Sequence, residues 1–475
     1  MVDNFDSDNI TYVDSVVDSL RFDEKVHLKP KEGNDITVKD KIECTEDLII
    51  DANLKTIGLM VNGKCVINGN LTAKESNISN KLEVNGSADL EDINVGNKIS
   101  ISGDFTCSNI NCGSKIKIGG SFKAIRAQIG GTLSVGNDID VQDLIIGGAF
   151  NGSGSINGSK VSIGGSFEFD GPVTALNKLS VGGKCFISGP VKTAKLNAGG
   201  SIEISNGLEA TSVKTGGTVE LAGDINFHDL KAGGSLVLAN NSHPFKSISV
   251  GGSIETENDL IGKEVEVGGK IISKGSIIVK LIDVGGKILA NKDIIAENVD
   301  VGGKVNAEGV IYVKENLSIG SKVFTASYLF ANTIEVGGKI ESLEVICRNL
   351  AVGESIKTVK GIFVLEKLQL GKKSQIEGPI IGEIISIGKK SKVEDVYGNQ
   401  IELEKFVTAG SIYGKHIIIK DNCTINGKVE YDGSLKSGSD VIFAEQPQKV
   451  DSLPDKPQPD ELPEEVKQKF LKLEE

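Results

Sequence analysis

A glycine recurs every ~17 residues through most of the chain, and this period constrains the fold more than any other feature. In each occurrence an apolar or small residue precedes one or two glycines. The first glycines of these steps are Gly96, Gly113, Gly130, Gly147, Gly164, Gly182, Gly199, Gly216, Gly233, Gly251, Gly268, Gly285, Gly302, Gly320, Gly337, Gly353, Gly371 and Gly388. Because the steps are nearly constant in length, they are typical of repeat proteins whose units pack against their neighbours.

Within one repeat, the apolar and small residues form pairs that lie two positions apart. In Val284–Asp300 these pairs include Ile288 with Ala290 and Ile294 with Ala296. Residues two apart share one face of a β-strand, and the glycine frequency disfavours helices. Three short strands per repeat predict an all-β fold, a single long parallel β-solenoid with triangular coils of about 17 residues. Roughly 20 or more coils at the ~4.8 Å strand spacing would form a rod ~100 Å long.

The glycine steps are expected at one corner of each coil. A residue without a Cβ atom tolerates a positive φ or a close approach to the coil below. Structural corner roles are assigned to Gly268, Gly285, Gly302 and Gly337. Two cysteines, Cys65 and Cys185, occupy a position that holds Ile or Val in other repeats, so they are expected to be small core side chains.

Three segments are expected from the change of pattern along the chain. The solenoid covers 41–445, and an acidic arm covers 1–40, where the spacing of Tyr12–Leu20 allows a short amphipathic helix that could act as a removable cap. The segment 446–475 is an acidic, proline-rich tail that ends in a possible helix after Pro463.

Two groups of apolar residues near the C-terminus are candidate contact sites. The helix of the tail would place Val466, Phe470 and Leu473 on one side, as a partner-docking surface or simply as part of a solvated tail. The ends of a solenoid present unpaired strand edges, which must be capped or paired with another molecule. At the C-terminal end Val441, Ile442 and Phe443 would either form an end-to-end contact or fill the last coil.

The sequence offers no candidate catalytic, cofactor-binding or metal-binding residues. Its four histidines lack the spacing of a metal site or of a nucleophile-base pair, and its seven cysteines include no CxxC motif. A net charge of −13 opposes a nucleic-acid partner, and an anionic membrane surface is likewise disfavoured. Without an apolar signal core or a long apolar run, the chain is expected to be a cytoplasmic protein. The lack of catalytic residue patterns predicts that it is not an enzyme.

The repeats resemble those of bactofilins, the polymer-forming cytoskeletal proteins. The resemblance covers roughly residues 60–440 and is clearest in VNGSADLEDINVGNKISISGDFTCSNINCGSKIKIGGSFKA, from Val84 to Ala124. It implies a right-handed triangular β-helix and nucleotide-independent assembly into filaments that scaffold other proteins, often at a membrane. This chain departs from the family in being about three times longer and in having an acidic start, which leaves membrane association open.

The function expected from these observations is structural. A β-helical rod would assemble end to end with copies of itself and bind other proteins through its termini. The first alternative is a monomeric spacer or adaptor that binds partner proteins, and the second is a polysaccharide-acting β-helix enzyme. Filaments would separate the first hypothesis from the adaptor, and an acidic cleft would favour the enzyme.

Overall fold

The chain forms two compact units of the same architecture. The computed structural model describes residues 10–240 and 243–474, and its compact units are Met1–Phe227, the N-terminal unit, and His228–Glu475, the C-terminal unit. Each unit is a parallel β-solenoid, and together they contain about 26 coils. The all-β solenoid and the period predicted from the glycine steps are confirmed, since Lys81 pairs with Lys98 and Lys98 with Lys115 on successive coils.

A typical coil contains one short and one long strand. In the N-terminal unit these are β10 (Lys81–Val84) and β11 (Ala88–Val95), which pair in parallel with β12 (Lys98–Ile101) and β13 (Phe105–Cys112) of the next coil. The ladder between β11 and β13 skips the residue after Leu90, where the long strand turns a corner. The predicted three inward pairs are present, but two of them lie on one interrupted strand, so the prediction of three separate strands is corrected.

The first described coils replace the helix that was expected near the N-terminus. Residues 10–40 contain β1 (Ile10–Val13), β2 (Val16–Val17), β3 (Leu20–Phe22), β4 (Val26–Pro30) and the start of β5 (Asp35–Cys44). Strands β2 and β3 both pair with β5, and β1 pairs with β4. The solenoid therefore begins before residue 41, and the expectation of a helical cap at Tyr12–Leu20 is wrong. Residues 1–9 of the predicted arm lie outside the described residues.

The C-terminal unit consists of alternating long and short strands followed by one helix. Its long strands are β29 (Phe245–Val250), β31 (Leu260–Val267), β33 (Ile277–Val284), β35 (Ile294–Val301), β37 (Ile311–Ile319), β39 (Tyr328–Val336), β41 (Glu344–Val352), β43 (Gly361–Gln369), β45 (Ile380–Ile387), β47 (Val396–Leu403), β49 (Ile412–Ile419) and β51 (Val429–Ser437). Short strands such as β34 (Lys287–Ala290) and β36 (Lys304–Ala307) alternate with them. After β52 (Ile442–Phe443) and β53 (Gln448–Lys449), the chain ends in α1 (Glu464–Glu474).

Identical positions of successive coils stack to form the core. Ile271, Ile288 and Val305 pair in register on three neighbouring short strands and have no exposed surface. Burial of each such side chain stabilises the fold by about 1.5–3 kcal/mol. Cys65 and Cys185 are also buried, as predicted, and burial raises the pKa of the Cys185 thiol to about 12. These thiols are packing groups.

The corner glycines are required by close packing between coils. A Cβ atom on Gly285 would lie 2.5 Å from the carbonyl oxygen of Gly268, and one on Gly302 would lie 2.6 Å from that of Gly285. Such distances are shorter than van der Waals contact. Of the two reasons considered for glycine at these corners, close approach is the one that the structure bears out.

Replacing Gly285 with Ala is expected to lower the free energy of unfolding by about 2 kcal/mol, because the backbone of two coils must separate to admit the methyl group. Chemical denaturation measures the effect. The control is Lys287→Ala, an exposed change on the same coil, which should alter stability by less than about 0.5 kcal/mol. An equal effect of the two changes would contradict the role assigned to Gly285.

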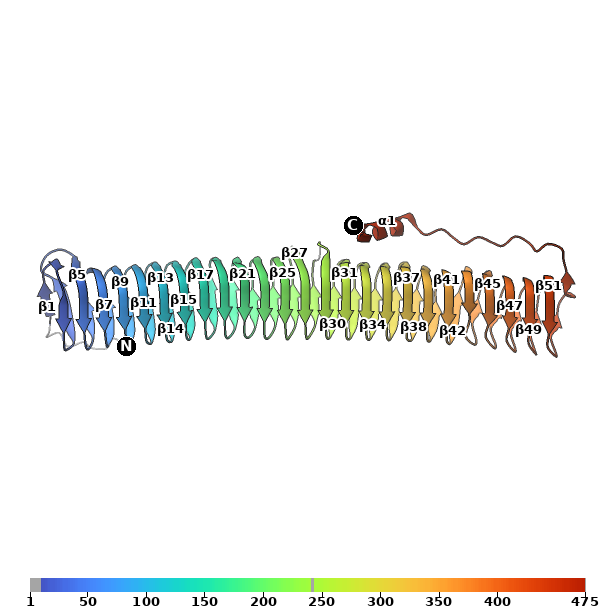
Figure 1. Ribbon diagram of the computed structural model, residues 1–475, viewed down its shortest axis with the longest axis horizontal. Helices are drawn as coiled ribbons and strands as arrows, with labels where there is room; N and C mark the ends of the chain where they lie inside the picture. The colour runs from blue at the N-terminus through green and yellow to red at the C-terminus, as the bar shows by residue number, and fades with distance from the viewer. Residues whose placement is uncertain (1–9, 241–242, 475) are drawn as a thin grey trace. The chain divides into compact units, whose positions relative to one another are not determined.

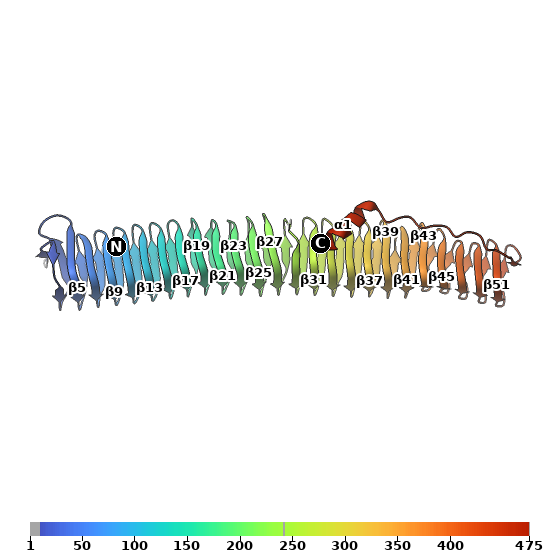
Figure 2. The same cartoon turned by 45° about the horizontal axis from the view of Figure 1, so that its top comes forward.

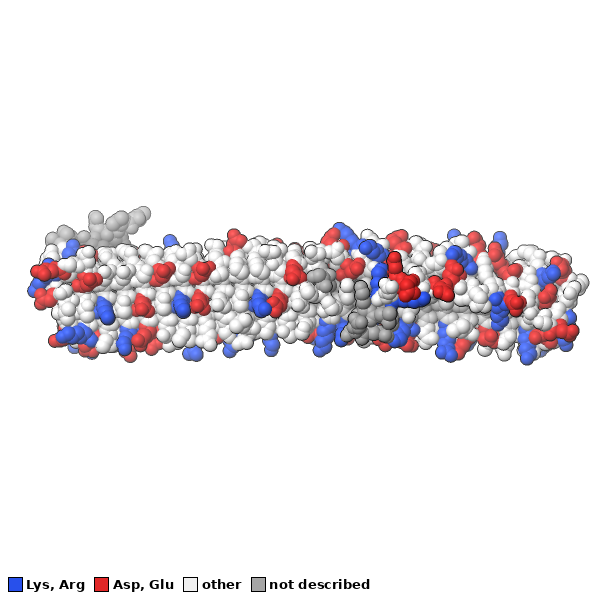
Figure 3. All heavy atoms as spheres, turned by 90° about the horizontal axis from the view of Figure 1, so that it is seen from above, with Lys and Arg blue, Asp and Glu red and all other residues white. Residues whose placement is uncertain are grey.

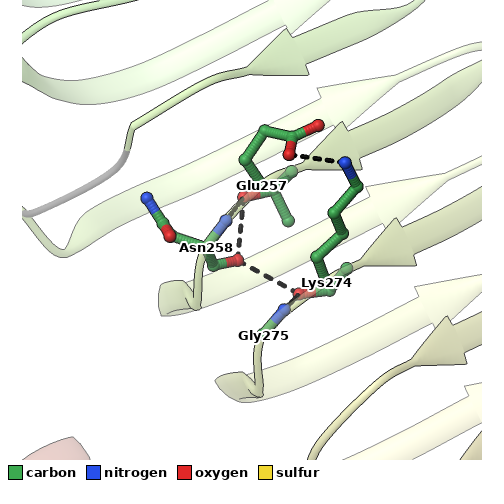
Figure 4. Close-up of polar contacts among 6 residues, drawn as sticks. Glu257, Asn258, Lys274 and Gly275 are labelled. Carbon is green, nitrogen blue, oxygen red and sulfur yellow. Dashed lines mark hydrogen bonds and ion pairs between the residues drawn. The ribbon is translucent and has the colours of Figure 1, made fainter.

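Polar side chains link neighbouring coils on the surface. Lys274 Nζ lies 2.6 Å from Glu257 Oε2 of the preceding coil, as Figure 4 shows. The hydroxyl of Ser273 donates to the carbonyl oxygen of Asn258 at 3.2 Å. Exposed ion pairs of this kind contribute little stability. On the face in Figure 3, acidic and basic side chains are interspersed over each unit, a pattern that favours solubility.

Candidate functional site: the tail-binding face and the last coil

The C-terminal tail folds back along its own unit. After β53 the segment 451–463 has no helix or strand, and it runs from the last coil toward α1, which lies beside the coils of β33 and β35 (Figures 1 and 2). The helix after Pro463 is thus confirmed. The helix packs on the solenoid of the same chain, so it is not simply part of a solvated tail. Docking on a partner protein stays a prediction.

The surface under the tail has an unusual column of residues. On most long strands, one outward-facing residue lies between the first two inward-facing ones, and the parallel pairing stacks these outward residues. In the N-terminal unit the column reads Lys55, Thr72, Asp89, Thr106, Lys123, Asp140, Asn157, Thr174, Lys192 and Glu209. In the C-terminal unit it reads Ile261, Ile278, Ile295, Tyr312, Phe330, Ile346, Phe363, Ile381, Tyr397 and Tyr413.

This second set, the apolar outer column, differs from its polar counterpart in burial as well as chemistry. Ile295 is 0% exposed and Ile278 is 6% exposed although both face outward, whereas Asp89 and Lys123 are exposed. An uncovered apolar patch of this size is typical of a surface that binds another segment or molecule. The tail provides the cover.

Helix α1 inserts Val466 into the apolar outer column. Val466 is 3% exposed and packs in one cluster with Ile278, Ile295, Val310 and Phe330. Leu462, just before the helix, packs against the same cluster. The other two residues predicted for this surface, Phe470 and Leu473, belong to α1, but their side chains lie outside the described part of the structure. An isolated helix of this length is marginal in water, so the contact stabilises the helix.

Charged groups flank the apolar contact and fix its position. Lys360 Nζ lies 2.7 Å from Asp460 Oδ2, and the Tyr328 hydroxyl donates to the same carboxylate oxygen at 2.9 Å. On the helix, Lys469 Nζ lies 2.5 Å from Asp293 Oδ2, whose carboxylate is mostly buried. The hydrogen bond from Lys360 holds the pKa of Asp460 below its ordinary value. The tail is therefore held at both sides of Val466 by groups of opposite charge.

A buried carboxyl group lies under the tail. Glu344, the first residue of β41, is 3% exposed, and its Oε2 atom has no hydrogen-bond partner among the described residues. Burial, followed by the negative charge of Asp460, raises the pKa of Glu344 to about 7, although Lys360 and the backbone amide of Asp460 oppose the shift. With the tail docked, Glu344 is therefore protonated more readily than an ordinary glutamate.

Docking of the tail is expected to weaken as the pH rises from 6 to 8. Release of the tail is expected to return the pKa of Glu344 toward its ordinary value of 4.5, against about 7 with the tail in place. Docking would then take up a proton in this window. The affinity should fall by up to about tenfold. The pKa of Asp460 is lowered and that of Lys360 is raised, so both groups stay charged between pH 6 and 8. Tyr328 also faces Glu344, since the two residues pair on neighbouring strands.

Fluorescence anisotropy with a labelled peptide of residues 451–475 measures this effect on a full-length Val466→Asp chain, whose own tail is released. The Glu344→Gln change in that chain should remove the pH dependence and give strong binding at pH 8. Binding that is constant between pH 6 and 8, or stronger at pH 8, would contradict the role of Glu344.

The second candidate site is the last coil of the solenoid. Val441 and Phe443 continue the inward columns of Cys423 and Ile425, and Leu435 continues that of Ile417. In the preceding coil, Cys423, Ile425 and Ile417 are each at most 1% exposed. In the last coil they are only half-buried. Ile442 points outward and is 64% exposed. The structure thus separates the predicted trio into two inward residues and one outward one.

The last coil is covered only in part. Strand β53 pairs with β51 through two residues, Glu430 with Gln448 and Tyr431 with Lys449, and the amide of Val450 donates to the carbonyl of Tyr431. The remainder of β51, which includes Leu435, has no pairing partner on this side among the described residues. Its free edge and half-buried core are features that a further coil would complete.

Among the described residues there is no group of three or more His, Cys, Asp or Glu side chains placed to hold a metal ion. Within the same part of the chain, no helix has the length and apolar character needed to cross a bilayer. Comparisons with protein-family models, curated proteins and solved structures give no match.

The apolar outer column was missed in the sequence. Its signal is a pair of adjacent apolar residues at or near the start of the long strands from β31 to β49, such as Ile277 with Ile278 and Ile294 with Ile295. Strict alternation assigns the second residue of each pair to solvent. Comparing the same position across all repeats would have found the change from polar residues, up to Asn226, to apolar residues from Ile261 onward.

Proposed function

We propose that this chain is a structural scaffold protein that assembles end to end through its last coil into nucleotide-independent filaments. The observation that carries the proposal is the change in burial at the last coil, where Val441, Phe443 and Leu435 are half-buried at positions that are fully buried one coil earlier. Stacking another molecule on this coil would continue the ladder and bury these side chains.

The proposal agrees with the resemblance of the repeats to bactofilins, and it requires no cofactor. It places the chain in the cytoplasm, where the seven buried, unpaired thiols would stay reduced. Each coil contributes mainly core side chains and short turns, so the activity of the molecule would lie in the surfaces that it presents.

Sedimentation velocity without nucleotide tests the proposal. The full-length protein should form species whose sedimentation coefficients increase with concentration. A single species that does not change with concentration would contradict end-to-end assembly. The Val466→Asp chain should assemble equally well, because the tail helix lies away from the last coil.

A second candidate function is that of an adaptor that binds partner proteins as a monomer. The apolar outer column favours it, because this surface already binds one amphipathic helix. The two functions differ in the sedimentation experiment: an adaptor would remain a single species.

A further inference from the structure

The tail contact contains everything that is needed to join two chains. We propose that the apolar outer column is a docking surface for the tail of a second copy of this chain, and that the tail docked on its own column is the closed form of the same contact. This inference goes beyond end-to-end assembly, because it uses a different surface of the C-terminal unit.

The first support for the inference is the fit of the occupant. The column accepts Val466 among Ile278, Ile295 and Phe330, and the flanking charges match on both sides. Each of these contacts lies between side chains of the tail and side chains of the solenoid. A second copy carries an identical tail, so it would make an identical contact, as in domain swapping.

The second support is the weak attachment of the segment that leads to the helix. Between Val450 and Pro463 no backbone-to-backbone hydrogen bond joins this described segment to the solenoid. Besides the Asp460 contacts, Lys456 lies 3.4 Å from Glu383, an exposed ion pair of small value. A cleft of about 440 Å³ lies along Pro457 and Pro459 beside the column. The tail is therefore held mainly near its helix.

The third support is the balance between the two forms. The contact within one chain and the contact between two chains bury the same groups, so they differ mainly in the entropy of association. A short tether raises the effective concentration of its own tail to the millimolar range. The closed form is therefore favoured in dilute solution, and exchange is favoured where copies are concentrated or where one tail is released.

A mixing experiment with two full-length variants tests the inference. The first variant, Val466→Asp, has a free column and a tail that no longer docks. The second, Ile295→Asp, has an intact tail and a column that no longer accepts it. Both carry Phe443→Arg, so that association through the last coil does not contribute. Circular dichroism confirms that each variant is folded, and Phe330→Asp repeats the second variant at another coil.

Each variant alone is expected to sediment as a monomer, and the mixture is expected to form a one-to-one complex. The labelled peptide of residues 451–475 should bind the Val466→Asp chain at least about tenfold more tightly than a chain with an intact tail and column, whose own tail competes. It should not bind the Ile295→Asp chain, and excess peptide should dissociate the complex.

Two outcomes would overturn the inference. In the first, the mixture remains monomeric although the peptide binds Val466→Asp, which would restrict the tail to its own chain. In the second, the peptide does not bind Val466→Asp, which would show that the column is not a docking surface for this tail. Failure of end-to-end assembly would leave both readouts unaffected, because the variants already lack it.

Discussion

Replacing Phe443 with Arg is expected to abolish end-to-end assembly and to leave the solenoid folded. Phe443 stacks on Ile425, which is fully buried, and is itself only half-buried at the last coil. In a junction its ring would be enclosed by the next molecule. An arginine there would bury a charge without a partner, at a cost of several kcal/mol, while in the free molecule its head would reach water.

The matched control for this change is Ile442→Arg. Ile442 is the preceding residue of β52, but its side chain is 64% exposed and points away from the core. The Ile442→Arg chain should assemble like the unchanged protein. Sedimentation measures both variants. Normal assembly of Phe443→Arg, or equal loss in both variants, would contradict a junction built on the inward columns.

Replacing Val466 with Asp is expected to release the tail and unfold its helix. The change removes an apolar side chain whose burial contributes about 1.5–3 kcal/mol and places a carboxylate among Ile278, Ile295 and Phe330. A helix of 11 residues has little stability without such a contact. Amide hydrogen exchange should show that α1 loses its protection by at least about tenfold, while the core strands keep theirs.

The control for the tail is Gln468→Asp, an exposed position of the same helix. It adds the same charge but leaves Val466 in place, so α1 should remain protected. Continued protection of α1 in Val466→Asp would contradict the docking contact. Equal loss in both variants would point to a general effect of charge on the helix.

Much of the fold follows from the sequence because a solenoid is built from local repeats. The pairs at Ile288 and Ala290 and at Ile294 and Ala296 are buried as predicted. These inward-facing pairs define the strands of one coil, and the next repeat places similar pairs at the same positions. The period and the inward pattern together therefore define the core. The predicted helix after Pro463 also formed, since its amphipathic pattern is contained in a single short segment.

The first coils could not be predicted in this way because they depart from the period. Val16 pairs with Thr37 and Leu20 pairs with Ile42, so partners there lie farther apart along the chain than partners in the regular coils. The apolar residues of Tyr12–Leu20 lie on short strands joined by turns, and their spacing along the sequence also fits an amphipathic helix. Their pairing with β5 decided the structure, and that pairing is not local.

The tail-binding face was inaccessible to local patterns for a similar reason. Ile295 faces outward by alternation, yet it is fully buried because the tail, which comes much later in the chain, covers it. One partner of the Asp293 carboxylate is Lys469, 176 residues away. The negative charge of Asp460 in the tail contributes to the raised pKa of Glu344, and these two residues lie far apart in the sequence.

Negative-stain electron microscopy of the full-length protein without nucleotide tests the central claim most directly. The unchanged chain and Ile442→Arg should form filaments, and Phe443→Arg should give separate particles. Separate particles in all three samples, at concentrations where the protein is folded, would contradict end-to-end assembly.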